Sequence, residues 1–140
     1  MSHEPAIAVE LPQTGRMRWV HAVELDTAGI CAVVKVEIDT DHPFAQDGKF
    51  LPSALIELMA QAAAAGTVAR ADRDGRKIRR GMLAAIQKFE ALSPVELPAM
   101  LTVETWEQKS FGQLTQALLT VHCEQTLVAR ALMTFHVEYQ

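Results

Sequence analysis

The 140-residue chain is predicted to fold as an α+β domain, with an antiparallel sheet curled around one long central helix. Residues 51–71 form a single apolar run of helical length. The segments on both sides of this run alternate between apolar and polar residues with a period of two, which is typical of β-strands. The connections between them are short, which favours antiparallel pairing of neighbouring strands.

The first two strands are expected over residues 16–25 and 29–39, with a turn near Asp26, Ala28 and Gly29. In the second strand two sets of residues alternate. One face carries Ile30, Ala32, Val34, Val36 and Ile38, and the other carries Cys31, Val33, Lys35 and Glu37.

Residues 40–50 contain Pro43 and Gly48 among polar side chains, so we expect an ordered loop there. Pro52 then suits the first turn of a helix, because its fixed φ fits and its missing N–H would have had no helical partner. A helix that continues to about Ala71 spans about 30 Å, at about 1.5 Å per residue. It is therefore expected to lie against or inside the sheet.

After a charged stretch at residues 71–81, four more strands are expected, at residues 82–89, 101–109, 113–123 and 127–139. The last alternates most regularly, so one side should meet a core while the other is at least partly solvated. The core set is Leu127, Ala129, Ala131, Met133, Phe135, Val137 and Tyr139, and the opposite set is Arg130, Thr134, His136 and Glu138.

The size and composition suit one compact domain over residues 1–140. A formal net charge of -4 argues against a general nucleic-acid binder. Glu57 interrupts the best candidate for a membrane span, and residues 1–13 lack the pattern of a secretion signal, so we expect a cytoplasmic protein. Cys31 and Cys123 show neither a disulfide framework nor metal-ligand spacing. The edge strand of such a sheet favours a dimer.

Glu57 and Gln61 stand one helical turn apart inside the apolar run. A carboxylate is rarely buried without a partner or a task, and residues one turn away on the same helix offer Glu57 no cation. Burial raises the pKa of a carboxyl group and can keep it protonated near neutral pH, ready to donate a proton. Glu57 is therefore the leading catalytic candidate, although backbone N–H groups or an arginine at a dimer interface would also satisfy it. Gln61 is expected mainly to fix a loop or a partner helix, and it can also orient Glu57.

Several short motifs together resemble the hot-dog fold family of 3-hydroxyacyl-acyl-carrier-protein dehydratases, and above all the dehydratase-like proteins of aryl polyene and related pigment pathways. The specific part is the helix motif at residues 57–62, Glu-Leu-Met-Ala-Gln-Ala. Weaker support comes from Asp-His-Pro-Phe at residues 41–44, Gly48, Leu-Pro at residues 51–52, and short motifs between Leu11 and Val137.

The resemblance implies an active site at a dimer interface, where a loop His of one subunit faces the helix carboxylate of the other. Glu57 matches that carboxylate, and the backbone amides of Ser53 and Ala54 match the place that holds the thioester carbonyl, with Gln61 beside the substrate. The family implies a substrate carried on acyl carrier protein or coenzyme A, and no metal or redox cofactor. In the expected mechanism His42 takes the α-proton and Glu57 delivers a proton to the departing hydroxyl.

The loop before the helix departs from the family pattern. Fatty-acid dehydratases carry Gly-His-Phe-Pro-Gly after their Pro-Phe, whereas Phe44 is followed here by Ala-Gln-Asp-Gly. His42 lies slightly upstream and could reach the helix carboxylate only if the shorter loop folds back. The ordinary alternative for His42 is a partly exposed loop residue beside a proline.

The basic stretch after the helix is a candidate docking site for the strongly acidic acyl carrier protein, and its alternative is a solvated linker. Its members are Arg76, Lys77, Arg79 and Arg80. Two further functions remain open for the chain as a whole. One is a hot-dog thioesterase, which uses a helix carboxylate to direct water and needs no basic His. The other is a non-catalytic subunit that pairs with an active homologue as a heterodimer.

Overall fold

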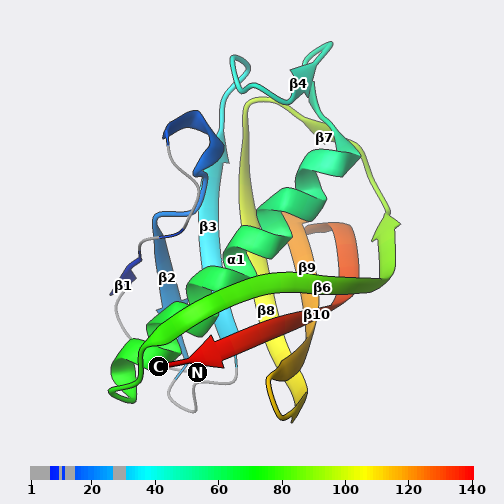
Figure 1. Ribbon diagram of the computed structural model, residues 1–140. Helices are drawn as coiled ribbons and strands as arrows, with labels where there is room; N and C mark the ends of the chain where they lie inside the picture. The colour runs from blue at the N-terminus through cyan, green and yellow to red at the C-terminus, as the bar shows by residue number, and fades with distance from the viewer. Residues whose placement is uncertain (1–6, 10, 12–14, 27–30) are drawn as a thin grey trace.

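The computed structural model describes residues 7–9, 11, 15–26 and 31–140, and its one long helix lies within a curled antiparallel sheet (Figure 1). The sheet order is β1-β2-β3-β8-β9-β10-β6, and β4, β5 and β7 form a small second sheet. The elements in chain order are β1 (Ile7–Ala8), the 3-10 turn η1 (Gly15–Met17), β2 (Ala22–Leu25), β3 (Cys31–Ile38), β4 (Ala45–Gln46), β5 (Lys49–Phe50), α1 (Pro52–Arg73), β6 (Ile78–Ala91), β7 (Val95–Glu96), β8 (Ala99–Phe111), β9 (Leu114–Cys123) and β10 (Thr126–Tyr139).

The helix α1 confirms the expectation for the apolar run. It begins at Pro52, after Leu51 in an extended conformation, and it ends at Arg73, two residues beyond the expected end. In Figure 1, α1 runs across β3, β8 and β9, while β10 and β6 curl round so that β6 crosses in front of the helix. Half of the helical residues are buried, because the sheet meets α1 on more than one side. No helix in the described ranges is long and apolar enough to cross a membrane.

The alternation expected for the strands is confirmed in β10 and β3. In β10, the five residues of the core set from Ala129 to Val137 are buried, and the set on the other face is half-buried or exposed. The two ends of the core set differ from the expectation, because Leu127 is half-buried and Tyr139 is 39% exposed. In β3, Lys35 and Glu37 are exposed, whereas the preceding outward residues Cys31 and Val33 are also covered. The side chains that point inward pack against α1 to form one core.

The first expected strand was wrong in its first half. The chain forms the turn η1 and then runs irregularly to His21, so regular pairing starts only at Ala22. The backbone N–H groups of Trp19 and Val20 donate to the side-chain oxygen of Gln61, at 2.8 and 3.3 Å. A side chain of the helix thus replaces the neighbouring strand as their partner. In the expected turn, Asp26 forms a bridge, and Ala28 and Gly29 lie outside the described residues.

The expected loop at residues 40–50 contains the hairpin of β4 and β5. Its two turn residues, Asp47 and Gly48, have φ values of 53° and 74°. Positive φ at both central positions is the geometry that Asp-Gly favours in two-residue hairpins. The hairpin therefore had a signal in the sequence, which the loop interpretation overlooked.

The strand β6 starts at Ile78, four residues earlier than expected, so half of the basic stretch belongs to a strand. It pairs with β10 along one side and forms the end of the large sheet. Nearly all of its side chains are exposed, and the large apolar ones, Met82, Leu83 and Ile86, are 50%, 37% and 40% exposed. A 14-residue edge strand that exposes large apolar side chains is a surface suited to another chain.

Candidate active site

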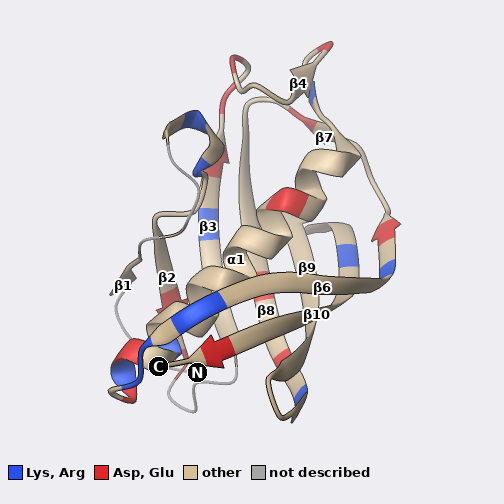
Figure 2. Ribbon diagram, in the orientation of Figure 1, with Lys and Arg blue, Asp and Glu red and all other residues tan. Residues whose placement is uncertain are grey.

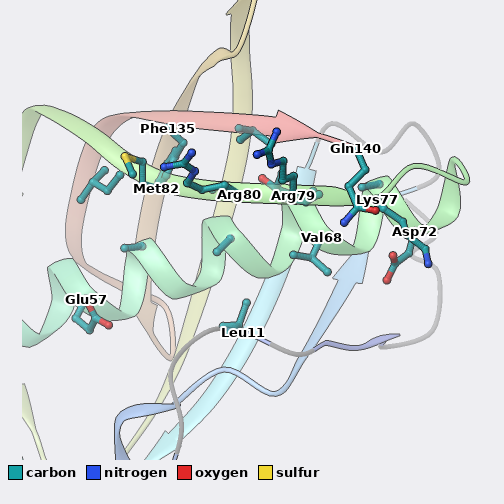
Figure 3. A pocket seen from close by; sticks show the side chains of 18 residues that line it. Leu11, Glu57, Val68, Asp72, Lys77, Arg79, Arg80, Met82, Phe135 and Gln140 are labelled. Carbon is teal, nitrogen blue, oxygen red and sulfur yellow. The ribbon is translucent and has the colours of Figure 1, made fainter.

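A cavity of about 720 Å³ lies between one face of α1 and the strand β6 (Figure 3). Phe135 and Val137 of β10 line it together with Leu11. Its volume falls within the range of small-molecule sites, roughly 300–1,000 Å³. The helix contributes Glu57, Ala60, Ala64, Thr67, Val68, Ala71 and Asp72, and β6 contributes Ile78, Arg79, Arg80, Gly81, Met82 and Leu83, with Lys77 and Gln140 beside them.

The small residues that form the helix side of this cavity are visible in the sequence, but the sequence analysis did not identify them as a cavity wall. Starting from Glu57, steps of three and four residues along a helix return to the same face. Ala60 and Ala64 lie on these steps, and their short side chains leave space between the helix and β6. The small residues on the same helix face as Glu57 could therefore have predicted the cavity wall from the sequence.

Glu57 is half-buried and lines the cavity at the end opposite Asp72 and Lys77 (Figure 3). The side-chain amide of Gln61 donates a hydrogen bond to its Oε1 atom at 3.0 Å. The carboxylate thus faces a space for a ligand while one of its oxygens is held in place by the helix itself.

Gln61 is fully buried, and its amide connects α1 to the irregular segment before β2. Its nitrogen donates to the carbonyl of Met17 at 2.7 Å as well as to Glu57, and its oxygen accepts from Trp19 and Val20. Four contacts use both donors and the acceptor of the amide. Gln61 does not line the cavity, and its hydrogen bonds connect Glu57 to the segment before β2.

His42 lies among aromatic rings outside the cavity that Glu57 lines. Its ring centroid is 4.7 Å from that of Trp19 and 5.0 Å from that of Phe50. The backbone N–H of Phe44 donates to its Nδ1 atom at 3.0 Å. Its Nε2 atom is buried, without a hydrogen-bond partner among the described residues. Burial, helped by the positive charge of Arg16, lowers the pKa of His42, and Asp41 opposes this shift.

His42 instead lines a second cavity, of about 400 Å³, which is bordered by β3 and the start of β2. Within one protomer, therefore, His42 and Glu57 are not brought together in the same cavity. The other residues around the second cavity are Arg18, Trp19, His21, Ala22, Lys35, Val36, Glu37 and Ile38.

The first turn of α1 holds the two residues whose amides were expected to bind a thioester carbonyl. Ser53 is exposed, and Ala54 is fully buried. The backbone N–H of Ala54 already donates to the carbonyl of Leu51 at 2.9 Å. Neither residue lines the cavity beside α1.

Three basic residues at or just before the start of β6 line the cavity, with Lys77 at the end away from Glu57 (Figure 3), and Figure 2 shows this basic part of the ribbon in blue. These residues are Lys77, Arg79 and Arg80, and the Arg80 Nε atom is 3.6 Å from a carboxylate oxygen of Glu138. Arg76 points elsewhere, with its guanidinium carbon 3.6 Å from the centre of the Tyr139 ring. Along the helix, Glu57 and Asp72 are about 22 Å apart at 1.5 Å per residue.

Other reactive groups offer no competing site in the part of the chain that the structure describes. Cys31 is buried, and burial, followed by the negative charge of Glu104, raises its thiol pKa to about 11, which suppresses the nucleophilic thiolate. Cys123 is also free. No three His, Cys, Asp or Glu side chains of the described residues gather closely enough to hold a metal ion.

Comparison with protein families gives one match that spans most of the chain. The ApeP-like family, described as ApeP dehydratase, matches residues 5–137. A search of curated proteins gave no match.

Solved structures share the fold at low sequence identity. A dehydratase heterocomplex, ApeI:P from Xenorhabdus doucetiae, is 17% identical, with a TM-score of 0.79 over 91% of this chain and 88% of that chain. The putative thioesterase yhdA from Lactococcus lactis is 12% identical, with a TM-score of 0.65 over 84% and 81%. A hypothetical thioesterase with coenzyme A from Streptococcus pneumoniae TIGR4 is 16% identical, with a TM-score of 0.65 over 79% and 80%. The antiparallel sheet around one long helix is thus the hot-dog fold expected from the sequence.

Proposed function

We propose that this chain, which belongs to the ApeP-like family of dehydratases, eliminates water from a 3-hydroxyacyl thioester. The observation that carries the proposal is the position of Glu57. It places a carboxylate, fixed by Gln61, at one end of an elongated cavity whose walls are largely small or apolar side chains. An acyl chain fits such walls, and the carboxylate supplies the proton-transfer group that dehydration needs.

The site is completed by a second subunit that adds to the edge strand β6. This strand exposes apolar side chains, and its inner face borders the cavity. A second subunit that pairs with β6 would therefore cover the apolar side chains and the cavity together. The separation of His42 and Glu57 within one protomer supports the same arrangement, in which His42 of one subunit meets Glu57 of the other. The partner is a second copy of the chain or a homologue, and the ApeI:P structure is itself a heterocomplex.

The basic end of the cavity suits the phosphate of a pantetheine arm, which acyl carrier protein and coenzyme A share. Lys77, Arg79 and Arg80 offer cationic donors at this end. Acidic carrier protein would gain additional attraction from the same residues. Arg76 is assigned to the outer margin of this docking surface, because its guanidinium stacks on Tyr139.

A thioesterase is the second candidate function. The Lactococcus and Streptococcus structures described as thioesterases share this fold, and a hydrolase needs only the helix carboxylate to direct water. A non-catalytic subunit of a heterodimer is the third, favoured by the absence of His42 from the cavity beside Glu57.

One incubation separates these functions. The purified protein is mixed with a 3-hydroxyacyl thioester and with a saturated acyl thioester, and the products are identified by mass spectrometry. Loss of water from the first substrate supports the dehydratase, and release of free thiol from either supports the thioesterase. If neither product forms, the dehydratase proposal for the chain alone is wrong and the subunit function stands.

The matched variant is Glu57→Gln, which keeps the size of the side chain and one oxygen that can accept from the Gln61 amide but cannot transfer a proton. It should abolish water loss while the protein remains folded by circular dichroism. Unchanged turnover in this variant would remove Glu57 from the mechanism.

A further inference from the structure

The edge of β3 that faces β2 is open along much of the strand. Strand β8 pairs with β3 over its whole length, whereas β2 pairs only with Ala32 and Val33. Before β2 begins, the backbone N–H groups of Trp19 and Val20 donate to the side chain of Gln61 instead. Beyond Val33, this edge of β3 therefore has no strand partner among the described residues.

The register of the two strands shows which backbone groups point toward the open edge. The N–H of Asp26 donates to the carbonyl of Cys31 at 3.0 Å, so the backbone polar groups of Cys31 point toward β2. Residues two apart along a strand direct their N–H and C=O groups to the same side. The backbone groups of Lys35 and Glu37 thus point toward this edge, past the last pair with β2. Such a row of N–H and C=O groups is a template for an added strand.

The second cavity, of about 400 Å³, lies along this edge. Val36 and Ile38 of β3 line it and are buried, as is Trp19 of the segment before β2. Lys35 and Glu37 also line it and are exposed. The cavity therefore joins an apolar interior to a polar margin that faces solvent, and its volume is within the range of ligand sites, roughly 300–1,000 Å³.

Basic groups predominate among the described residues around this cavity. Arg18 and Lys35 carry a positive charge and His21 can gain one, whereas Glu37 carries a negative charge. Figure 2 shows basic residues both in the segment before β2 and on β3. The Nε atom of Arg18 is buried without a hydrogen-bond partner in the described ranges, so the fold leaves its guanidinium incompletely paired. This charge balance favours an acidic ligand.

We propose that this cavity binds an extended acidic peptide segment of a partner protein, which adds to the open edge of β3 as a strand. The edge offers both N–H donors and C=O acceptors at Lys35 and Glu37. A peptide backbone matches both kinds of group, whereas a simple anion would be repelled by the carbonyl oxygens. In this mode of recognition, backbone pairing supplies affinity and the side-chain surroundings supply specificity.

The cavity also indicates the sequence pattern of the bound segment. Side chains of a strand point alternately to its two faces. One set enters the cavity beside the buried residues Val36 and Ile38 and is therefore apolar. The other set lies on the solvent side, near the exposed residues His21 and Lys35, and is therefore acidic. The segment is thus expected to alternate between acidic and apolar residues.

This site is separate from the cavity beside Glu57. The two cavities share none of the residues that line them, and β8, β9 and β10 stand between β3 and β6 in the sheet order. A dimer paired through β6 does not use this edge. Peptide binding at β3 therefore holds or fails independently of the dehydratase activity.

Binding of a designed hexapeptide to the full-length protein tests the proposal. The probe alternates Glu and Val, with a fluorescent label at its N-terminus and an amide at its C-terminus, and binding is followed by anisotropy. One control peptide has Lys in place of Glu, and in the other every backbone N–H is methylated. We expect saturable binding of the probe, and binding at least about tenfold weaker for both controls.

NMR of the ¹⁵N-labelled protein then locates the bound probe. The amide signals of Lys35 and Glu37 should shift on addition of the probe. Shifts confined to other parts of the chain, or no saturable binding, would overturn the proposal. Equal binding of the methylated peptide would also overturn it, because that peptide cannot pair with a strand edge.

Lys35→Glu provides the matched test of charge in the protein. This side chain is exposed, so the variant should remain folded by circular dichroism, and its affinity for the probe should fall at least about tenfold. Lys109→Glu, at an exposed position of β8, is the control and should change the affinity by less than about twofold. His21→Glu gives a second variant in case Lys35→Glu does not fold, with the same loss expected. Unchanged affinity in either folded variant would contradict the proposal.

Discussion

Gln61 is the residue on which the local geometry of the site depends most. It holds Glu57 on one side and the backbone of residues 17–20 on the other, and the indole of Trp19 in turn contacts His42. One buried amide therefore holds Glu57 directly and also fixes the backbone of Trp19, whose ring packs against His42. This role was only partly predictable, because a sequence reveals the one-turn spacing to Glu57 but not the chain segment that reaches the helix from 40 residues away.

Replacing Gln61 with Leu should lower the free energy of unfolding by about 1–3 kcal/mol, because the backbone N–H groups of the buried residues Trp19 and Val20 lose their acceptor. Urea denaturation measures this effect. The matched control is Gln108→Leu, since Gln108 is exposed and its side-chain amide donates to the carbonyl of Trp106 at 3.3 Å, and its change should stay within about 0.5 kcal/mol. Equal effects in the two variants would contradict the role of Gln61.

The lowered pKa of His42 predicts a pH-dependent stability. In the unfolded chain this side chain binds a proton at about pH 6.5, whereas the folded protein resists protonation until a lower pH. The contribution of His42 to stability is therefore present above about pH 6.5 and is lost as the pH falls toward the folded-state value. Urea midpoints on both sides of this window should differ less in His42→Gln than in the wild type. A steeper pH dependence in the variant would show the opposite sign of shift.

At the scale of elements, the packing of α1 against β3 depends on Gly66. A Cβ atom at this position would lie 2.9 Å from the Cβ of Ala32 and 3.5 Å from the hydroxyl oxygen of Thr105. The glycine is thus explained by the close approach of the helix to the sheet, despite its unfavourable helix propensity. Pro52 and the apolar run were enough to predict where α1 begins and, to within two residues, where it ends, but this contact depends on residues that only the fold brings together.

Gly66→Ala should lower the free energy of unfolding by about 1–2 kcal/mol, because the strain of overpacking outweighs the gain in helix propensity. Combining it with Ala32→Gly should recover part of the loss by removing the facing Cβ. Gly81→Ala serves as the control, since its nearest neighbouring atom would be 3.9 Å away. If thermal or urea unfolding instead showed a higher free energy of unfolding for Gly66→Ala, α1 and β3 could move apart at this contact without loss of stability.

At the scale of the whole molecule, the long helix and the strands with a buried face were predicted well, whereas the edge strand β6 was predicted poorly. The period-two faces of β3 and β10 and the long helix were readable, because burial imposes them on each strand. The length of β6 was underestimated, because its basic start suggested a linker and its exposed faces carry no clear alternation. An edge strand whose side chains are nearly all exposed lacks the pattern that burial within its own chain would impose.

The same exposed edge explains why the candidate site was only half predictable. Glu57 could be found from its helix, whereas one protomer places His42 in a different cavity, and the two residues meet only in the proposed two-subunit site. A symmetric dimer through β6 would contain two sites, each combining residues of both subunits. Such a dimer predicts that two inactive variants recover activity when their protomers are mixed, which no rearrangement within one protomer can produce.

The most direct measurement is the dehydration of a 3-hydroxyacyl thioester by mixed protomers of Glu57→Gln and His42→Ala, each nearly inactive alone. Random exchange in an equal mixture makes half of the dimers mixed, and each of these has one intact pair, so activity should return to on the order of a quarter of the wild type. Subunit exchange is verified by native mass spectrometry in the same samples. Recovery near this level supports a catalytic carboxylate shared across the β6 interface, and no recovery despite verified exchange would contradict it.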